Sequence, residues 1–215
     1  MVRSTASRTA SRSRPASSDG LRHAPAHWWR PSAFGLAAAL VCAGPGFGQA
    51  LTEKLALCGA CHGEDGNSKM PDIPSLAGQP RFFIFSQLFL MREGVRKVDA
   101  MAAIVKDLKD PDLDELSEHY AKQTPKQSAE PIDPAMVKRG SELAETKRCS
   151  SCHSPTLGGQ EQIPRVAKQR VDYLILALKA FRDGTRTGAD TLMGGPVAGL
   201  SDADLTALAH YAAAH

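Results

Sequence analysis

The sequence predicts an all-α chain in which two small helical domains follow one another, and three observations predict it. A segment of about 80 residues occurs twice along the chain. In both copies, apolar residues recur three and four positions apart, as they do on one face of a helix. No segment alternates convincingly between apolar and polar residues, as a half-buried strand would. We therefore expect helices and loops in both copies.

Composition excludes several classes of protein. The chain has 215 residues, of which 42% are apolar and 23% charged, so it is neither a disordered tail nor a multi-span membrane protein. Its net charge of +3 comes from the N-terminus, because the first 50 residues hold six Arg and one Asp. The rest carries 20 basic and 22 acidic side chains, a net charge of −2. We therefore expect no nucleic-acid partner.

Residues 1–50 are predicted to be a signal peptide with a long N-terminal region. A stretch rich in Ser, Arg, Ala and Pro precedes a short apolar run, which ends in Gly48-Gln49-Ala50. The run is too short, and too interrupted by Gly and Pro, to span a bilayer comfortably. We expect export to the periplasm and cleavage near Ala50, which would also remove Cys42; an uncleaved anchor is the alternative.

The internal repeat begins at a Cys-x-x-Cys-His motif. Residues 58–62 read CGACH, and residues 149–153, 91 positions later, read CSSCH. The correspondence continues to the last helix, and insertions or deletions of one or two residues vary the offset between 90 and 92. It pairs Ile73 with Ile163, Gln79 with Gln169, Arg96 with Arg186, Met101 with Met193 and Leu116 with Leu208. The sequence therefore predicts a first repeat at 51–123 and a second repeat at 134–215.

The first repeat is expected to begin with a helix over 51–57 that leads into the motif. Residues 81–93 have helical apolar spacing and end before Gly94. The last helix begins after Asp110, where Pro111 suits the first helical position.

Residues 124–133 are expected to form a linker. Together with Pro134 this stretch contains three prolines, which is typical of a semi-rigid surface segment. The second repeat then follows the same order, with helices expected over 134–147 and 171–183. The last helix begins at Ser201, with Asp204 three residues later, close to a capping box.

The Cys-x-x-Cys-His motif is the signature of covalent haem attachment. Two thiols bind the two vinyl groups of one porphyrin edge, and the adjacent His reaches the iron from the same face. We therefore expect two haem c groups, bound through Cys58, Cys61 and His62 and through Cys149, Cys152 and His153. A Cys-four zinc site is an alternative, but it would leave the His and the repeated downstream Met incidental. A redox dithiol would need a βαβ setting, which is absent.

The second iron ligand is predicted to be a Met thioether, which raises the reduction potential in cytochromes c. Met193 is the only Met after His153. In the first repeat Met70, Met91 and Met101 are candidates, and only Met101 has a Met counterpart in the second repeat. We therefore expect Met101 and Met193 to be the ligands.

From residue 51 onwards, the chain resembles the diheme cytochrome c-four family, in which two class I cytochrome c domains are fused. The resemblance is carried by CGACHGEDGNS at 58–68, PSLAGQ at 74–79, CSSCHSP at 149–155 and FRDGTRT at 181–187. It implies that each domain wraps around its haem, with His and Met on each iron. It also implies that the carbonyls of Pro74 and Pro164 accept the second N–H of the ligand imidazoles. The counterpart of PSLAGQ in the second repeat, PRVAKQ at 164–169, departs from the family pattern with Lys168, where the first repeat has Gly78.

Two irons closed by His and Met have no vacant position for a substrate, so we expect an electron carrier and not an enzyme. The resemblance implies a quinol:cytochrome c oxidoreductase as donor and a terminal oxidase as acceptor, with the carrier either free or at the membrane surface. An alternative is the electron-transfer subunit of a periplasmic dehydrogenase. A haem enzyme is a third alternative, but it would need an open iron or a Cys ligand, and no Cys is spare once the leader is removed.

Overall fold

The computed structural model describes residues 47–186, 188 and 191–215, and all of these belong to one compact unit. Throughout these ranges the regular structure is helical, apart from an isolated bridge between Gln160 and Ile163. The all-α prediction is confirmed. Of the predicted leader, residues 1–46 lie outside the described residues. Among the described helices, none is long and apolar enough to cross a membrane.

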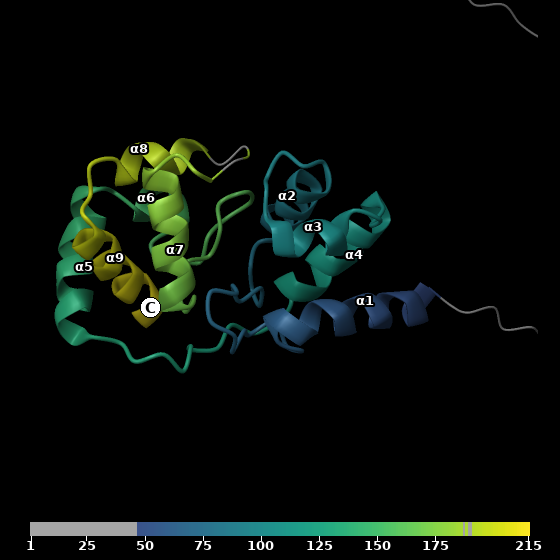
Figure 1. Ribbon diagram of the computed structural model, residues 1–215. Coiled ribbons are helices and arrows are strands. Elements are labelled where there is room, and N and C mark those ends of the chain that lie inside the picture. The colour runs from purple at the N-terminus through teal and green to yellow at the C-terminus, as the bar shows by residue number, and fades with distance from the viewer. Residues whose placement is uncertain (1–46, 187, 189–190) are drawn as a thin grey trace, which may run out of the picture. The chain divides into compact units, whose positions relative to one another are not determined.

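The first repeat contains four helices within the described residues (Figure 1). They are α1 (Phe47–His62), α2 (Arg81–Arg92), α3 (Asp99–Val105) and α4 (Asp110–Ala121). Helix α4 packs against α2 and α1, and α3 packs against α2. The three predicted helices are present, whereas α3 was not predicted, because seven residues are too few to show a helical period.

The second repeat has the same order of main helices. They are α5 (Pro134–Thr146), α6 (Ser150–His153), α7 (Val171–Arg182) and α9 (Asp202–Ala214), with the short η1 (Thr191–Met193) and α8 (Gly194–Val197) before α9. The predicted capping box at α9 is confirmed, because the N–H of Asp204 donates to Ser201 Oγ at 3.2 Å and the N–H of Ser201 donates to Asp204 Oδ2 at 3.0 Å.

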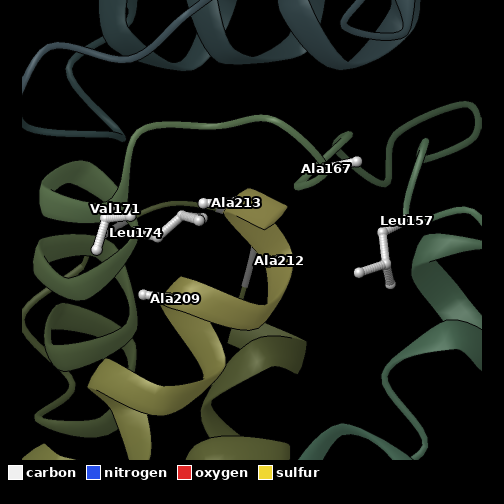
Figure 2. Packing of buried hydrophobic residues seen from close by; sticks show 7 residues of the cluster. All are labelled: Leu157, Ala167, Val171, Leu174, Ala209, Ala212 and Ala213. Carbon is white, nitrogen blue, oxygen red and sulfur yellow. The ribbon is translucent and has the colours of Figure 1, made fainter. Parts of the chain in front are cut away.

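Helices α5 and α9 cross closely at Gly140. A Cβ atom at this position would lie 2.1 Å from the carbonyl oxygen of Ala207, so only glycine allows the approach. On its other side, α9 packs against α7. Figure 2 shows Val171 and Leu174 of α7 beside the alanines of α9, with Ala167 and Leu157 contributed by the loop after α6.

The last helices of the two repeats bury equivalent positions, 92 residues apart. On α4 the buried residues are Leu113, Leu116, Ser117 and Tyr120; their counterparts on α9 are Leu205, Leu208, Ala209 and Ala212, which are also buried. The pattern of burial agrees with the register that the leucines of the sequence indicate.

The linker is held to both repeats by hydrogen bonds. The N–H of Lys126 donates to Asn67 Oδ1 at 2.8 Å in the first repeat. In the second repeat, the Glu130 carboxylate accepts the N–H groups of Val171 and Asp172 at 2.8 and 3.0 Å, which satisfies two free donors at the start of α7.

Candidate functional site

The first motif lies at the C-terminal end of α1. Cys58, Cys61 and His62 stand at positions i, i+3 and i+4 of this helix, so their side chains share one face. Both thiols are free; Cys58 is half-buried and Cys61 is exposed. Two thiols and an imidazole on one helical face can bind one planar group at its edge and at its centre.

The imidazole of His62 is fixed by a single hydrogen bond. It is 8% exposed, and its Nδ1 lies 2.8 Å from the carbonyl oxygen of Pro74. Because a carbonyl only accepts, Nδ1 carries the proton, and Nε2 keeps its lone pair for a metal. Burial lowers the pKa of His62, which favours the neutral form that binds iron.

The second motif reaches the same geometry by a different backbone path. Helix α5 ends at Thr146, Arg148 takes a φ of 55°, and Ser150 begins the short α6. His153 is 6% exposed, and its Nδ1 donates to the carbonyl of Pro164 at 2.8 Å. Burial lowers the pKa of His153 as well. The break in the helix therefore does not alter how the imidazole is held.

The two predicted Met ligands occupy equivalent places. Met101 lies in α3, which packs against α2, and Met193 ends η1, which packs against α7. Both are half-buried, whereas Met70 is 44% exposed in a loop. Their role as iron ligands stays a prediction.

The described residues do not join the two Cys-x-x-Cys motifs in one zinc site. In residues 47–186 and 191–215, no three His, Cys, Asp or Glu side chains converge as a metal-ion site. Each motif instead has its own buried His, with its own proline carbonyl.

The charge of Arg165 shows that the structure fits a haem. This guanidinium is 4% exposed; Nε donates to the carbonyl of Ala77 at 3.1 Å and Nη1 to that of Ala167, while Nη2 is buried without a partner among the described residues. Burial lowers the pKa of Arg165 to about 10. A buried cation without an anion is costly. The carboxylate of a haem propionate would supply that anion, so the residues present fit the group.

Besides Arg165, sequence reasoning missed two further candidates, the buried side chains of Gln79 and Gln169. Each bonds to the loop that holds the predicted ligand His of the other repeat. Their pairing at a shift of 90 was visible in the sequence, but the periodicity of one chain does not reveal which backbone groups a side chain meets. Arg165 was missed because nothing in the sequence marks it as buried.

Comparison with known proteins identifies relatives along most of the chain. The family model of cytochrome c matches residues 137–213. Cytochrome c4 of Pseudomonas aeruginosa is 37% identical over 169 residues, which cover 74% of this chain and 83% of that protein. The crystal structure of reduced recombinant cytochrome c4 from Pseudomonas stutzeri aligns with a TM-score of 0.69 at 34% identity, and covers 78% of this chain and 97% of that one.

A relative with a different name is similar at nearly the same coverage. The thiosulfate dehydrogenase electron acceptor of Thiomonas intermedia is 30% identical over 192 residues, which cover 82% of this chain and 86% of that protein.

Proposed function

Because the chain belongs to the cytochrome c4 family, we propose that it is a periplasmic carrier that takes electrons from a quinol:cytochrome c oxidoreductase and delivers them to a terminal oxidase. Membership of the family means that the chain carries covalently bound haem c in two class I cytochrome c domains and transfers electrons. What we propose beyond this is its donor, its acceptor, its compartment and its ligand residues.

The observation that carries the proposal is the duplicated, buried His–Pro pair. His62 and His153 each donate Nδ1–H to a proline carbonyl at 2.8 Å. When bound, haem c supplies an iron that gains and loses one electron. The imidazoles stay neutral and keep one orientation, and the surrounding chain excludes water from them. A site that does not rearrange when its charge changes suits rapid electron exchange.

Met101 and Met193 complete the proposed ligand sets. Replacing either residue by Ala should remove the low-spin Met signature of one site and lower its reduction potential, because a Met ligand raises that potential. Met70→Ala is the matched control, since this residue is 44% exposed in a loop. Unchanged spectra in both ligand variants would refute the assignment.

The two repeats differ in charge. Residues 51–133 carry 10 basic and 14 acidic side chains, and residues 134–215 carry 10 and 8. A carrier with one negative and one positive domain can present different ends to donor and acceptor, since charge sets encounter rate and orientation. We expect the rate of association with each partner to depend on ionic strength; rates that are independent of salt would argue against steering.

Rapid mixing tests the proposed direction of transfer. The haem-loaded chain should be reduced by a purified quinol:cytochrome c oxidoreductase and then oxidised by a haem-copper oxidase, each in a second-order reaction. Transfer with neither partner would refute the carrier role as proposed. Mass spectrometry and fractionation of the producing cell test the compartment, with loss of residues 1–50 and periplasmic recovery as the expected result.

A second function is the electron-transfer subunit of a periplasmic dehydrogenase. It is supported by the 30% identity to the thiosulfate dehydrogenase electron acceptor of Thiomonas intermedia. Stable co-purification with a catalytic subunit, and reduction by that subunit faster than by the quinol enzyme, would favour this function over the free carrier.

A further inference from the structure

Two buried glutamines connect the repeats. Gln79 donates Nε2–H to the carbonyl of Arg165 at 2.9 Å and accepts the N–H of Arg165 through Oε1 at 3.0 Å. Gln169 makes the equivalent pair with Ser75, at 2.9 Å and 2.8 Å. The four residues are between 2% and 4% exposed. Each amide is thus fixed by at least two bonds in a place that water does not reach.

Each glutamine binds the peptide group that also holds a ligand His. The carbonyl of Pro164 accepts Nδ1–H of His153, and the N–H of the same peptide group, that of Arg165, donates to Gln79. A chain of hydrogen bonds therefore runs from an imidazole of the second repeat, through one amide, to a side chain of the first repeat.

The first repeat has the mirror arrangement. His62 donates to the carbonyl of Pro74, and the N–H of Ser75, in the same peptide group, donates to Gln169. Hydrogen bonds linked through one amide polarise one another. An acceptor at the N–H end therefore makes the carbonyl at the other end a stronger acceptor.

We propose that Gln79 and Gln169 are positioning residues, each of which sets the strength of the His hydrogen bond in the opposite repeat and so couples the two electron-transfer sites. The inference rests on the proposed His ligation. A stronger bond to Nδ1–H raises the basicity of the imidazole, and a more basic imidazole favours the oxidised iron. Each glutamine should therefore lower the reduction potential of the site in the other repeat.

Gln79 is the better residue to change, because both of its side-chain bonds go to Arg165 of the second repeat, whereas Gln169 Oε1 also accepts the N–H of Arg170 in its own repeat. In the haem-loaded full chain, Gln79→Ala should raise the potential of the second-repeat site. Gln79→Glu places a charged acceptor at the same N–H, so it should lower that potential. The first-repeat site should shift less in both variants.

The experiment is spectroelectrochemical titration of both sites, with the hyperfine-shifted NMR signals used to assign each potential to its repeat. Gln123→Ala is the control, because the side-chain amide of Gln123 bonds to His119 in its own repeat. It should leave the second-repeat potential unchanged. The proposal would be overturned if either Gln79 variant shifted the first-repeat potential more than the second-repeat potential. It would also be overturned if Gln79→Ala and Gln79→Glu shifted the second-repeat potential in the same direction.

Two safeguards keep the outcome decisive. Should Gln79→Ala not fold, Gln79→Glu keeps the side-chain size, and the sign of its shift at the second-repeat site decides alone. The spin state of the unaltered chain distinguishes a failure of the coupling between the repeats from a failure of the proposed His–Met ligation. If both sites are low-spin and no shift crosses between the repeats, the coupling fails and the carrier survives; if the unaltered chain is not low-spin, the ligation itself fails.

Discussion

The two repeats build the same loop beside the His of the motif, but a different element supplies the large side chain near that loop. In the first repeat the carbonyl of Gly66 accepts the N–H groups of Leu76 and Ala77, at 2.7 and 3.0 Å. In the second repeat the carbonyl of Leu157 accepts those of Val166 and Ala167, at 2.9 and 3.0 Å. Both turn residues have a positive φ, 74° at Gly66 and 55° at Leu157.

In each repeat, one residue of the loop and one residue of the last helix form a pair of one large and one small side chain, and the large one belongs to a different element in each repeat. Gly66 lies against Tyr120 of α4, so that a Cβ at Gly66 would be 2.9 Å from the ring. The counterpart of Tyr120 on α9 is Ala212, and Leu157 belongs to the same apolar cluster as this alanine (Figure 2). At this pair of positions the helix supplies the large side chain in the first repeat, and the loop supplies it in the second. What both repeats keep is the backbone of the loop, whose proline carbonyl holds the His of the motif.

The largest effect should follow from giving the first repeat the loop residue of the second. In Gly66→Leu the new side chain meets Tyr120 and the backbone of Ala77. Overpacking and the left-handed backbone together should cost about 3–5 kcal/mol of unfolding free energy. Denaturant unfolding of the haem-loaded chain measures this. Gly94→Leu is the control, because Gly94 has a φ of 69° but nothing within 4 Å, and should cost only about 1 kcal/mol.

Removing the loop side chain of the second repeat should have the next largest effect. Leu157 is 2% exposed, so Leu157→Ala leaves a cavity and should cost about 3 kcal/mol in the same unfolding measurement. Leu192→Ala, at a residue that is 84% exposed, should change stability by less than about 0.5 kcal/mol. Equal losses in the two variants would mean that Leu157 does not support the core.

Exchanging both members of the pair tests the comparison itself. Tyr120→Ala in the Gly66→Leu background gives the first repeat the side chains of the second. We expect the two changes to offset each other by about 2 kcal/mol relative to the sum of the single losses, since they meet in one space. A double-mutant cycle in denaturant measures this coupling. If the two losses of unfolding free energy simply add, the side chains at positions 66 and 120 do not compete for one space.

The smallest effect concerns the cap of α9, where Ser201 supplies a hydroxyl that its first-repeat counterpart Lys109 lacks. The side chain of Ser201, then Arg139 and the backbone of Ser201, hold the pKa of Asp204 down at about 2. A folded pKa below the unfolded value stabilises the protein above about pH 4, and this stabilisation is lost as the pH falls towards 2. Asp204→Asn should therefore cost about 0.5–1 kcal/mol at pH 7, and progressively less as the pH falls to about 2 and below. Stability curves against pH for both proteins check this, with the exposed Asp107→Asn as control.

Much of this structure could be predicted from the sequence, because the repeat fixes register. Helices α2, α4, α5, α7 and α9 lie close to where the periodicity placed them, and Ser201 caps α9 as expected. The hydrogen bonds from His62 and His153 to Pro74 and Pro164 are those that the family resemblance implied.

Other features could not be predicted, for identifiable physical reasons. The break between α5 and α6 depends on the positive φ of Arg148, and a positive φ cannot be predicted from the sequence at a residue that is not glycine. The compensation between Gly66 and Tyr120, and the glutamine pairs, arise between segments that are far apart in the chain. A single sequence shows which positions repeat, but not which of them touch.

The central claim is that both repeats hold a closed His–Met site. The most direct measurement is the optical spectrum of the reduced, haem-loaded chain with and without carbon monoxide. We predict two c-type haems whose spectra do not change when the gas is added. Carbon monoxide binding at either haem would contradict the account, because it would mean that one iron is open or weakly closed, and that the protein can bind a small ligand where a carrier should not.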